Sequence, residues 1–199
     1  MGFTLWFKRF LMSLIPAVLF SAVQPSYAAS EDAWSSLKSG NRVVFIRHAV
    51  TEPGVGDPEG FVIGACSTQR NLSAQGRADA KAIGEAFRSR AIPVSEVLTS
   101  RWCRCVDTAM LAFGKATPAP MIDSMFNDRE KSDEAKIREV IAYAGNTGKR
   151  ATPGNLVLVT HAVNVQALTG VYPAPGEIVV TTFDAGKFKP VGRINLFSR

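Results

Sequence analysis

Short apolar runs alternate with longer segments of helical periodicity over most of this chain. The runs are rich in Val, Ile, Leu and Phe, which is typical of strands buried on both faces of a sheet. Three such strands are predicted at residues 42–46, 94–99 and 155–160. Residues 177–182 and 189–197 flank an Asp-Ala-Gly-Lys turn and predict a hairpin near the end of the chain.

Segments of helical period separate these strands. Ser73 is a suitable N-cap, Ile83 and Phe87 lie on one apolar face, and Pro93 follows the expected helix end. Helices are predicted over residues 34–40, 73–90, 100–114, 132–144 and 162–169. The alternation of strand and helix predicts a three-layer α/β/α sandwich with a mostly parallel central sheet, whose ligand site lies at the carboxyl ends of the strands.

Residues 51–69 are rich in Gly, Pro, Asp and Ser and show no hydrophobic period. They predict a long loop over one edge of the domain, and long loops of this kind are often functional.

The first 29 residues have the layout of a signal peptide. Lys8 and Arg9 precede an apolar run over residues 10–23, and small residues around Ala28 provide a cleavage site. Pro16 interrupts the run, which is shorter than the ~20 residues that a membrane span needs. We therefore expect cleavage near Ala28, a single mature domain over residues 30–199, a periplasmic or secreted location and no stable membrane span.

Charge narrows the class of partner. The chain has 23 basic and 17 acidic residues, and cleavage removes two basic ones, which lowers the formal net charge from +6 to +4. Because no long basic cluster with interleaved aromatic residues is present, nucleic acid is disfavoured as a partner. Small anionic substrates fit this mildly basic chain better, and no pattern in the sequence indicates an oligomeric state.

The chain contains three cysteines, which would meet an oxidising compartment after export. Cys103 and Cys105 point in different directions on a helix, so a bond between them is disfavoured. Cys66 could reach either of them, and the sequence leaves the choice open.

The only two histidines each follow a predicted buried strand, His48 after one and His161 after another. Both therefore belong to the same edge of a parallel sheet. Arg47 precedes the first histidine, and Arg101 and Arg104 begin the helix that follows a third strand. Helix N-termini and guanidinium groups bind tetrahedral oxyanions, so this edge should hold a phosphate.

Neighbouring arginines also affect the histidines themselves. Positive charge lowers the pKa of an imidazole, and only a neutral imidazole can attack phosphorus. One histidine could thus be a nucleophile and the other a stabiliser of charge.

Four motifs in this order resemble the histidine phosphatase superfamily, whose members are similar to phosphoglycerate mutase. They are the triplet Arg47-His48-Ala49, the segment Asn-Leu-Ser-Ala-Gln-Gly-Arg at 71–77, the segment Ser-Arg-Trp-Cys-Arg-Cys-Val-Asp-Thr-Ala at 100–109, and Thr160-His161-Ala162. Together they extend over residues 42–170 and identify the chain as an exported bacterial-type member.

The resemblance implies a metal-independent phosphatase with no cofactor. His48 would carry the phosphoryl group, Arg47 and Arg104 would bind its oxygens, and His161 would stabilise the transition state. Arg101 would then be a bystander or would support a residue that contacts the phosphoryl group.

Two features depart from the family pattern or are ambiguous. Ala49 stands where the family has glycine, and the acidic proton donor could be Asp128, Glu130 or Glu52. Arg70 and Asn71 could equally reach the pocket or merely lead into the following helix.

The expected function is hydrolysis of a small or envelope-associated phosphate monoester through a phosphohistidine. A mutase is disfavoured because cytosolic sugar phosphates are not normally available outside the inner membrane. Two alternatives from other classes stay open: a metal-binding or redox protein that uses His and Cys ligands, although the Cys-x-Cys spacing supports it poorly, and an inactive phosphate-binding module.

Overall fold

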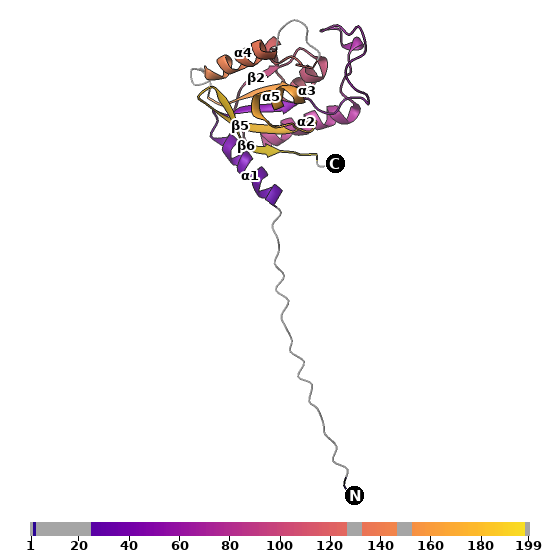
Figure 1. Ribbon diagram of the computed structural model, residues 1–199. Helices are drawn as coiled ribbons and strands as arrows, with labels where there is room; N and C mark the ends of the chain where they lie inside the picture. Colours follow the sequence, from indigo (N-terminus) through magenta and orange to yellow (C-terminus); the bar gives the residue numbers. More distant parts are fainter. Residues whose placement is uncertain (1, 3–24, 127–132, 147–152, 198–199) are drawn as a thin grey trace.

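A computed structural model describes residue 2 and residues 25–126, 133–146 and 153–197 of the chain (Figure 1). The predicted signal peptide therefore falls mostly outside the described residues and stays a prediction, although helix α1 (Pro25–Lys38) begins within its last residues. Among the described segments, no helix combines the length and apolarity that crossing a membrane requires.

A six-stranded sheet forms the centre of the domain, in the order β3-β2-β4-β1-β5-β6. The strands are β1 (Val43–Arg47), β2 (Val94–Thr99), β3 (Thr117–Pro118), β4 (Asn155–Thr160), β5 (Ile178–Asp184) and β6 (Lys187–Ile194). Strands β1 to β4 pair in parallel, and the β5–β6 hairpin adds to β1 in antiparallel orientation. The predicted mostly parallel sheet is confirmed.

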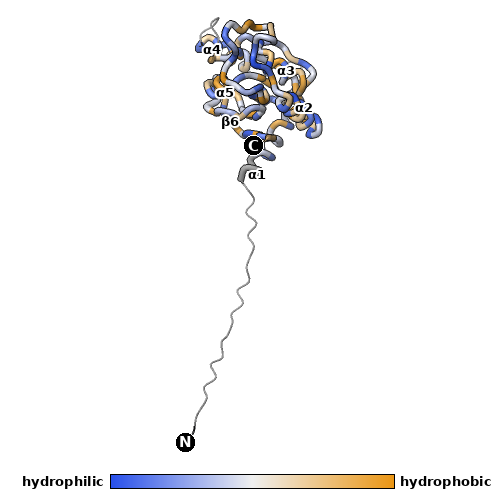
Figure 2. The backbone as a smooth tube through the Cα atoms, turned by 90° about the vertical axis from the view of Figure 1, so that its right-hand side faces the viewer, coloured by the Kyte–Doolittle hydropathy of each residue, from blue (hydrophilic) through white to orange (hydrophobic). Residues whose placement is uncertain are grey.

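Helices cover both faces of this sheet (Figure 1). They are α1, α2 (Ala74–Ser89), α3 (Cys103–Phe113), α4 (Asp133–Gly145) and α5 (Ala162–Thr169), with short 3-10 helices η1 (Cys66–Thr68) and η2 (Pro120–Ile122). Hydrophilic and hydrophobic residues alternate along α2, α3 and α4 (Figure 2), as expected of helices that bury one face.

Two hydrophobic cores lie between the layers, one on each face of the sheet. Because the strands are pleated, each central strand contributes side chains to both cores. In β1, Val44 and Ile46 pack in a core with α1, α2 and α3. Val43 and Phe45 point to the opposite face and pack in a core with α4 and α5. Alternate side chains of one strand therefore complete both cores, which makes a central strand apolar throughout.

Most predicted elements agree with the observed ones within a few residues, but three predictions do not. The helix predicted over residues 34–40 is observed as α1, which begins nine residues earlier, at Pro25. The sequence pattern missed β3 and η2, because a two-residue strand containing Pro118 leaves no periodic signal. The prediction that a helix begins at Ser100 was wrong, because α3 has Trp102 as its N-cap and begins at Cys103. Arg101 consequently precedes the helix, whereas Arg104 lies in its first turn.

A disulfide joins Cys66 of the long loop to Cys103 at the start of α3. This settles the pairing that the sequence left open, and Cys105 is a buried free thiol. Hydrogen bonds reinforce the attachment, since the Cys103 amide donates to Gln69 Oε1 at 2.9 Å and Asn71 Nδ2 donates to the Cys66 carbonyl at 2.6 Å. The loop is thereby fixed to α3 at one end.

We expect a Cys66→Ala/Cys103→Ala variant to lose about 3–4 kcal/mol of unfolding free energy, because the bond closes a loop of 37 residues. Urea denaturation with and without reductant measures the loss. Reductant should destabilise the native chain by a similar amount and leave the double variant unchanged. Equal sensitivity of both proteins to reductant would show that the disulfide does not stabilise the fold.

Candidate active site

Parallel pairing places both histidines at one edge of the sheet. Arg47 is opposite Thr160 in the β1–β4 register, and the histidine that follows each residue leaves its strand at the same edge. The rings of His48 and His161 lie with their centroids 5.5 Å apart in an edge-to-face arrangement. The sequence prediction that the two side chains share one edge is confirmed.

His48 is held in a single orientation by its own backbone. Its Nδ1 lies 2.9 Å from the Ala49 carbonyl oxygen, and its amide donates to the Thr160 carbonyl at 2.9 Å. Because a carbonyl oxygen can only accept, the proton of the neutral ring resides on Nδ1. Nε2 therefore carries the lone pair, which is the state that a nucleophile requires.

The surroundings keep the His48 ring neutral. Burial, reinforced by the positive charge of Arg104 and then of Arg47 and Arg70, lowers the pKa of His48 to about 3. The imidazole is therefore unprotonated over the whole physiological pH range.

Ala49 fits without strain at the position where the family has glycine. Its backbone φ is not positive, and its amide donates to Thr108 Oγ1 at 3.1 Å. The methyl group is fully buried against Leu72 and Ala80. The substitution therefore leaves the turn after β1 intact.

Three arginines bring unpartnered nitrogen atoms to this region. The Nε atoms of Arg47, Arg70 and Arg104 are buried and have no hydrogen-bond partner among the residues that the structure describes. Unpaired buried donors cost stability, and three of them close to His48 indicate a place for an anionic ligand.

Arg47 is fixed by the segment before β5. Its Nη1 donates to the Pro173 carbonyl at 3.0 Å, and its guanidinium carbon lies 5.9 Å from the ring centre of Tyr172. Burial lowers the pKa of Arg47, and the neighbouring Arg70 and Arg104 add to this effect. Its charge has no carboxylate partner among the ion pairs of the described residues.

Arg104 is paired with a carboxylate that sequence reasoning missed. Asp57, from the long loop, accepts from Nη1 of Arg104 at 2.7 Å and from Nη2 at 3.2 Å. The same carboxylate accepts from Trp102 Nε1 at 3.0 Å and from the Arg70 amide at 3.0 Å. Despite burial, these donors hold the pKa of Asp57 below its usual value, so Asp57 is charged.

Arg70 lies close to the pocket, which decides an alternative that the sequence left open. Its carbonyl accepts from Arg104 Nη1 at 3.4 Å, and its own Nη1 donates to the Gly54 carbonyl. Its charge is among those that lower the pKa of His48. Asn71 instead holds the loop, because its Nδ2 donates to the Cys66 carbonyl.

His161 contacts a buried polar chain. Its Nε2 lies 2.9 Å from Ser100 Oγ, and that hydroxyl donates to Asp123 Oδ1 at 3.2 Å. Asp123 also accepts from the amide of Arg101 at 2.7 Å and from its Nε at 2.5 Å. Arg101 is thus paired away from the histidines, and the Ser100 hydroxyl is engaged here instead of capping α3.

Of the three predicted proton donors, Glu52 alone is among the described residues. Glu52 is exposed, and its amide donates to the Asn71 carbonyl. Asp128 and Glu130 lie outside the described residues, so these candidates stay predictions. Asp57 lies in a loop without hydrophobic periodicity, so no sequence pattern predicts its contacts. Its place in a long, polar loop was the one sign of a functional role.

The described residues offer little to a metal. No group of three or more His, Cys, Asp or Glu side chains with metal-binding geometry occurs in the ranges that the structure covers. The disulfide also occupies two of the three cysteines on which the metal-binding alternative depended. Burial raises the pKa of the third, Cys105, to about 12, which keeps it a thiol.

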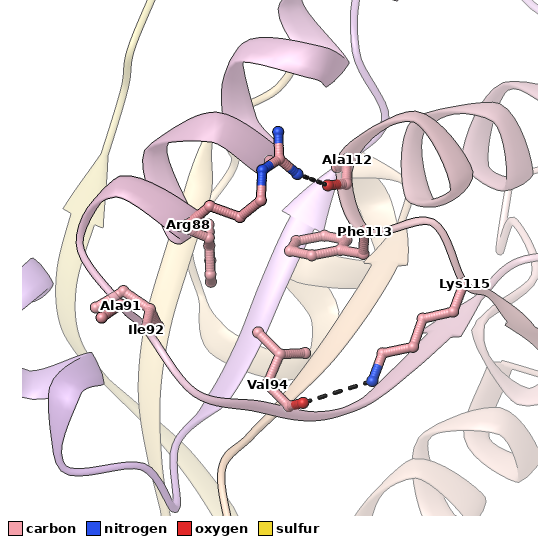
Figure 3. Close-up of a pocket in the computed structure, with 9 residues that line it drawn as sticks. Arg88, Ala91, Ile92, Val94, Ala112, Phe113 and Lys115 are labelled. Atoms are coloured by element: carbon pink, nitrogen blue, oxygen red, sulfur yellow. Dashed lines mark hydrogen bonds between the residues drawn. The ribbon is translucent and has the colours of Figure 1, made fainter.

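A separate cavity lies at the other end of β2, between the ends of α2 and α3 (Figure 3). Apolar side chains such as Phe87, Ile92 and Phe113 line it. Arg88 donates to the Ala112 carbonyl at 3.0 Å and Lys115 to the Val94 carbonyl at 3.5 Å. It lacks the histidines and lies away from the carboxyl ends of the strands, so it is not the site of the chemistry.

Comparison with known proteins agrees with this geometry. The family model of the histidine phosphatase superfamily (branch 1) matches residues 43–130. No curated protein sequence matches the chain significantly.

Several solved structures resemble the fold at low sequence identity. The protein histidine phosphatase SixA, complexed with tungstate, is 15% identical with a TM-score of 0.55, and the match covers 77% of this chain and 96% of SixA. An open reading frame product of Mycobacterium tuberculosis is 14% identical with a TM-score of 0.53, covering 75% and 94%. The alpha-ribazole phosphatase from Shigella flexneri is 16% identical with a TM-score of 0.51, covering 74% and 93%.

We expect Asp57→Ala to lower the unfolding free energy by about 3–5 kcal/mol, because the buried Arg104 guanidinium loses its partner. Inorganic phosphate should restore part of this loss by supplying negative charge. Thermal unfolding with and without phosphate measures both effects.

Asp184→Ala is the matched control, since its pair with Lys189 is exposed. This variant should unfold at nearly the same temperature as the native chain and respond to phosphate as the native chain does. An equal phosphate-induced stabilisation of Asp57→Ala and Asp184→Ala would contradict a phosphate site beside Arg104.

Proposed function

We propose that this chain, which the histidine phosphatase family model matches over residues 43–130, hydrolyses a phosphate monoester through a phosphohistidine on His48. The observation that carries this proposal is the state of His48, whose Nδ1 proton is held by the Ala49 carbonyl at 2.9 Å. This leaves Nε2 unprotonated beside three arginines and a second histidine.

In the first step, His48 Nε2 attacks phosphorus in line with the leaving oxygen. The N–P bond forms as the P–O bond breaks, and the leaving oxygen departs as an alcohol once it takes a proton. Water then attacks the phosphohistidine, breaks the N–P bond and releases inorganic phosphate. His48 is regenerated neutral, ready for another cycle.

Charge matching supports a phosphomonoester dianion as the ligand. Asp57 already neutralises Arg104, whereas Arg47 forms no ion pair with a described carboxylate. Arg70 lies against the Gly54 carbonyl and the Asp57-bound loop. Arg47 thus supplies a positive charge without a described carboxylate partner, and Arg70 adds one that Asp57 partly offsets. The three unpartnered Nε atoms supply donors for the phosphoryl oxygens.

His161 would stabilise charge on the phosphoryl group during transfer. Burial, with help from His48, Arg104, Lys136 and Arg47, holds the pKa of His161 well below its usual range. The side chain is therefore neutral in the empty site, and an arriving dianion opposes those positive charges and favours its protonation.

We also infer that the protein acts outside the cytoplasm, as a periplasmic or secreted enzyme on a small or envelope-associated phosphate ester. The signal-like first 29 residues support this inference. The Cys66–Cys103 disulfide is compatible with it, because such bonds persist in oxidising compartments.

Substitution of His48 tests the proposed intermediate. We expect His48→Ala to lose essentially all hydrolysis of p-nitrophenyl phosphate, and rapid quenching of the native protein with labelled substrate to trap acid-labile, base-stable phosphate. Full activity in His48→Ala would refute the mechanism. A native protein that binds phosphate yet traps none and releases no product would instead be an inactive phosphate-binding module.

Substitution of Arg70 tests the assignment of charge in the pocket. We expect Arg70→Gln to raise KM about tenfold or more and to weaken inhibition by inorganic phosphate, because a charge-assisted hydrogen bond contributes about 1.5–3 kcal/mol. Steady-state kinetics measures this change. Arg88→Gln, at the exposed pair with Glu85 on α2, is the matched control. Unchanged KM and phosphate inhibition in Arg70→Gln would limit Arg70 to a role in the loop.

A further inference from the structure

The polar chain behind His161 is fully buried and uses residues from two separate segments. Ser100 follows β2, and Asp123 follows η2; both are 0% exposed. The backbone around Asp123 is fixed as well, since its carbonyl accepts from Asn164 Nδ2 at 2.8 Å and from Lys136 Nζ at 3.4 Å. Burying these polar groups away from solvent costs free energy, which indicates that they have a functional role.

Hydrogen counting over the nitrogen and oxygen contacts of Ser100 indicates the direction of these bonds, with the Cys105 thiol as a further, weak neighbour of both Ser100 and His161. Ser100 Oγ lies 2.9 Å from His161 Nε2, 3.2 Å from Asp123 Oδ1 and 3.3 Å from the Trp102 amide. The amide can only donate, and a carboxylate can only accept. The single hydroxyl proton therefore belongs between Ser100 and Asp123, and the hydroxyl oxygen accepts from both Trp102 and His161.

The opposite assignment leaves one contact without a hydrogen. If Ser100 donated to His161 Nε2, its oxygen would face Asp123 Oδ1 with no proton between them. Asp123 forms an ion pair as a carboxylate, because the amide and Nε of Arg101 both donate to it. Although burial raises the pKa of Asp123, all of these contacts are donors and favour its charged form.

We propose that Asp123 and Ser100 are positioning residues that hold His161 as its Nε2–H tautomer and stabilise its imidazolium form. Nε2–H donates to Ser100, Ser100 donates to Asp123, and Nδ1 is left with the lone pair that accepts a proton. Protonation of Nδ1 from solvent then gives an imidazolium whose charge faces the Asp123 carboxylate through one hydroxyl. This role rests on the proposed function, in which His161 stabilises phosphoryl charge.

Several groups surround His161 and affect the equilibrium between its neutral and protonated forms, which Asp123 also affects. The groups that disfavour its charged form are His48, Arg104, Lys136 and Arg47. The neighbouring Cys105 Sγ, 3.5 Å from Nε2, is an uncharged thiol. Asp123 is the buried carboxylate connected to the ring, so its removal should make the imidazolium harder to form.

The two histidines are thereby assigned opposite tautomers. His48 carries its proton on Nδ1, because the Ala49 carbonyl accepts it, and His161 carries its proton on Nε2, because Ser100 accepts it. Since the chain has only two histidines, the ring nitrogens can be resolved without crowding. One measurement thus addresses the nucleophile and its helper separately.

Long-range 1H–15N spectra of the ¹⁵N-histidine-labelled protein test this assignment, with His48→Gln used to identify the remaining ring. We expect the Nδ1–H pattern for His48 and the Nε2–H pattern for His161. An Nδ1–H pattern for His161 would overturn the proposal. An Nε2–H pattern for His48 would contradict the proposed nucleophile instead, so the two failures are distinguishable.

Variants of Ser100 connect the tautomer to activity. Ser100→Ala should lower kcat at least about tenfold with little change in KM, and should shift His161 toward mixed tautomers. Ser100→Thr, which keeps the hydroxyl, should recover most of the activity. Ser95→Ala, which removes a hydroxyl from the other end of β2, should behave as the native protein.

Asp123→Asn provides the second variant, since an amide keeps the shape and removes the charge. We expect the same loss of kcat and a weaker tendency of His161 to protonate in the presence of phosphate. If both variants kept the native tautomer pattern and the native kcat, the hydrogen bonds from His161 through Ser100 to Asp123 would have a structural role only, and the proposal would fail. Should a variant fail to fold, the tautomer of His161 in the native protein still decides the proposal.

Discussion

Parallel pairing of β1 with β4 is the constraint on which the rest of the site depends. It sets Arg47 opposite Thr160, so that the next residue of each strand is a histidine at the same edge. The pairing is enforced by burial, because alternate residues of β1 fill two different cores. A slip of one residue would exchange the faces of Val44 and Phe45, so the energy of core packing maintains the catalytic geometry.

Charge imposes the second constraint. Two histidines can be buried among arginines only if they stay neutral, and a neutral imidazole is the form that the proposed nucleophile requires. Arg104 and Arg101 are each matched by a buried carboxylate, Asp57 and Asp123 respectively. These ion pairs offset the cost of burying the guanidinium groups. The unpartnered Nε atoms remain available to donate to an anion. Unpartnered donors at this edge of the sheet thus lower the stability of the empty protein and raise its affinity for an anion.

Much of the fold and of the site could be predicted from the sequence, because apolar runs show where the buried strands end. Apolar runs located β1, β2 and β4, and the rule that parallel strands end at one edge is enough to bring His48, His161 and Arg104 together. Asp57 could not be found in this way. It lies in an aperiodic loop, and its contact with Arg104 depends on a path through space that no local pattern encodes. The partner of Cys66 was undetermined for the same reason.

Ser100 shows a different limit of sequence reasoning. A serine after a strand and before a helix is an ordinary N-cap, and local propensity alone favours that role. Here the hydroxyl has three neighbours, two of them from distant parts of the chain, and α3 begins later, at Cys103. Tertiary hydrogen bonding outweighed the capping preference because a buried histidine and a buried carboxylate both needed a partner.

The long loop adds what the strand ends cannot supply. It contributes Asp57 near one end and Arg70 just beyond the other, and these two residues meet because the Arg70 amide donates to Asp57 at 3.0 Å. The Cys66–Cys103 disulfide anchors the same segment to the helix that carries Arg104. The sheet therefore positions the two histidines, whereas a covalently anchored loop sets the charge around them. Since loops vary more readily than packed strands, under the proposed function the loop would select among phosphate esters and the sheet would set the reaction type.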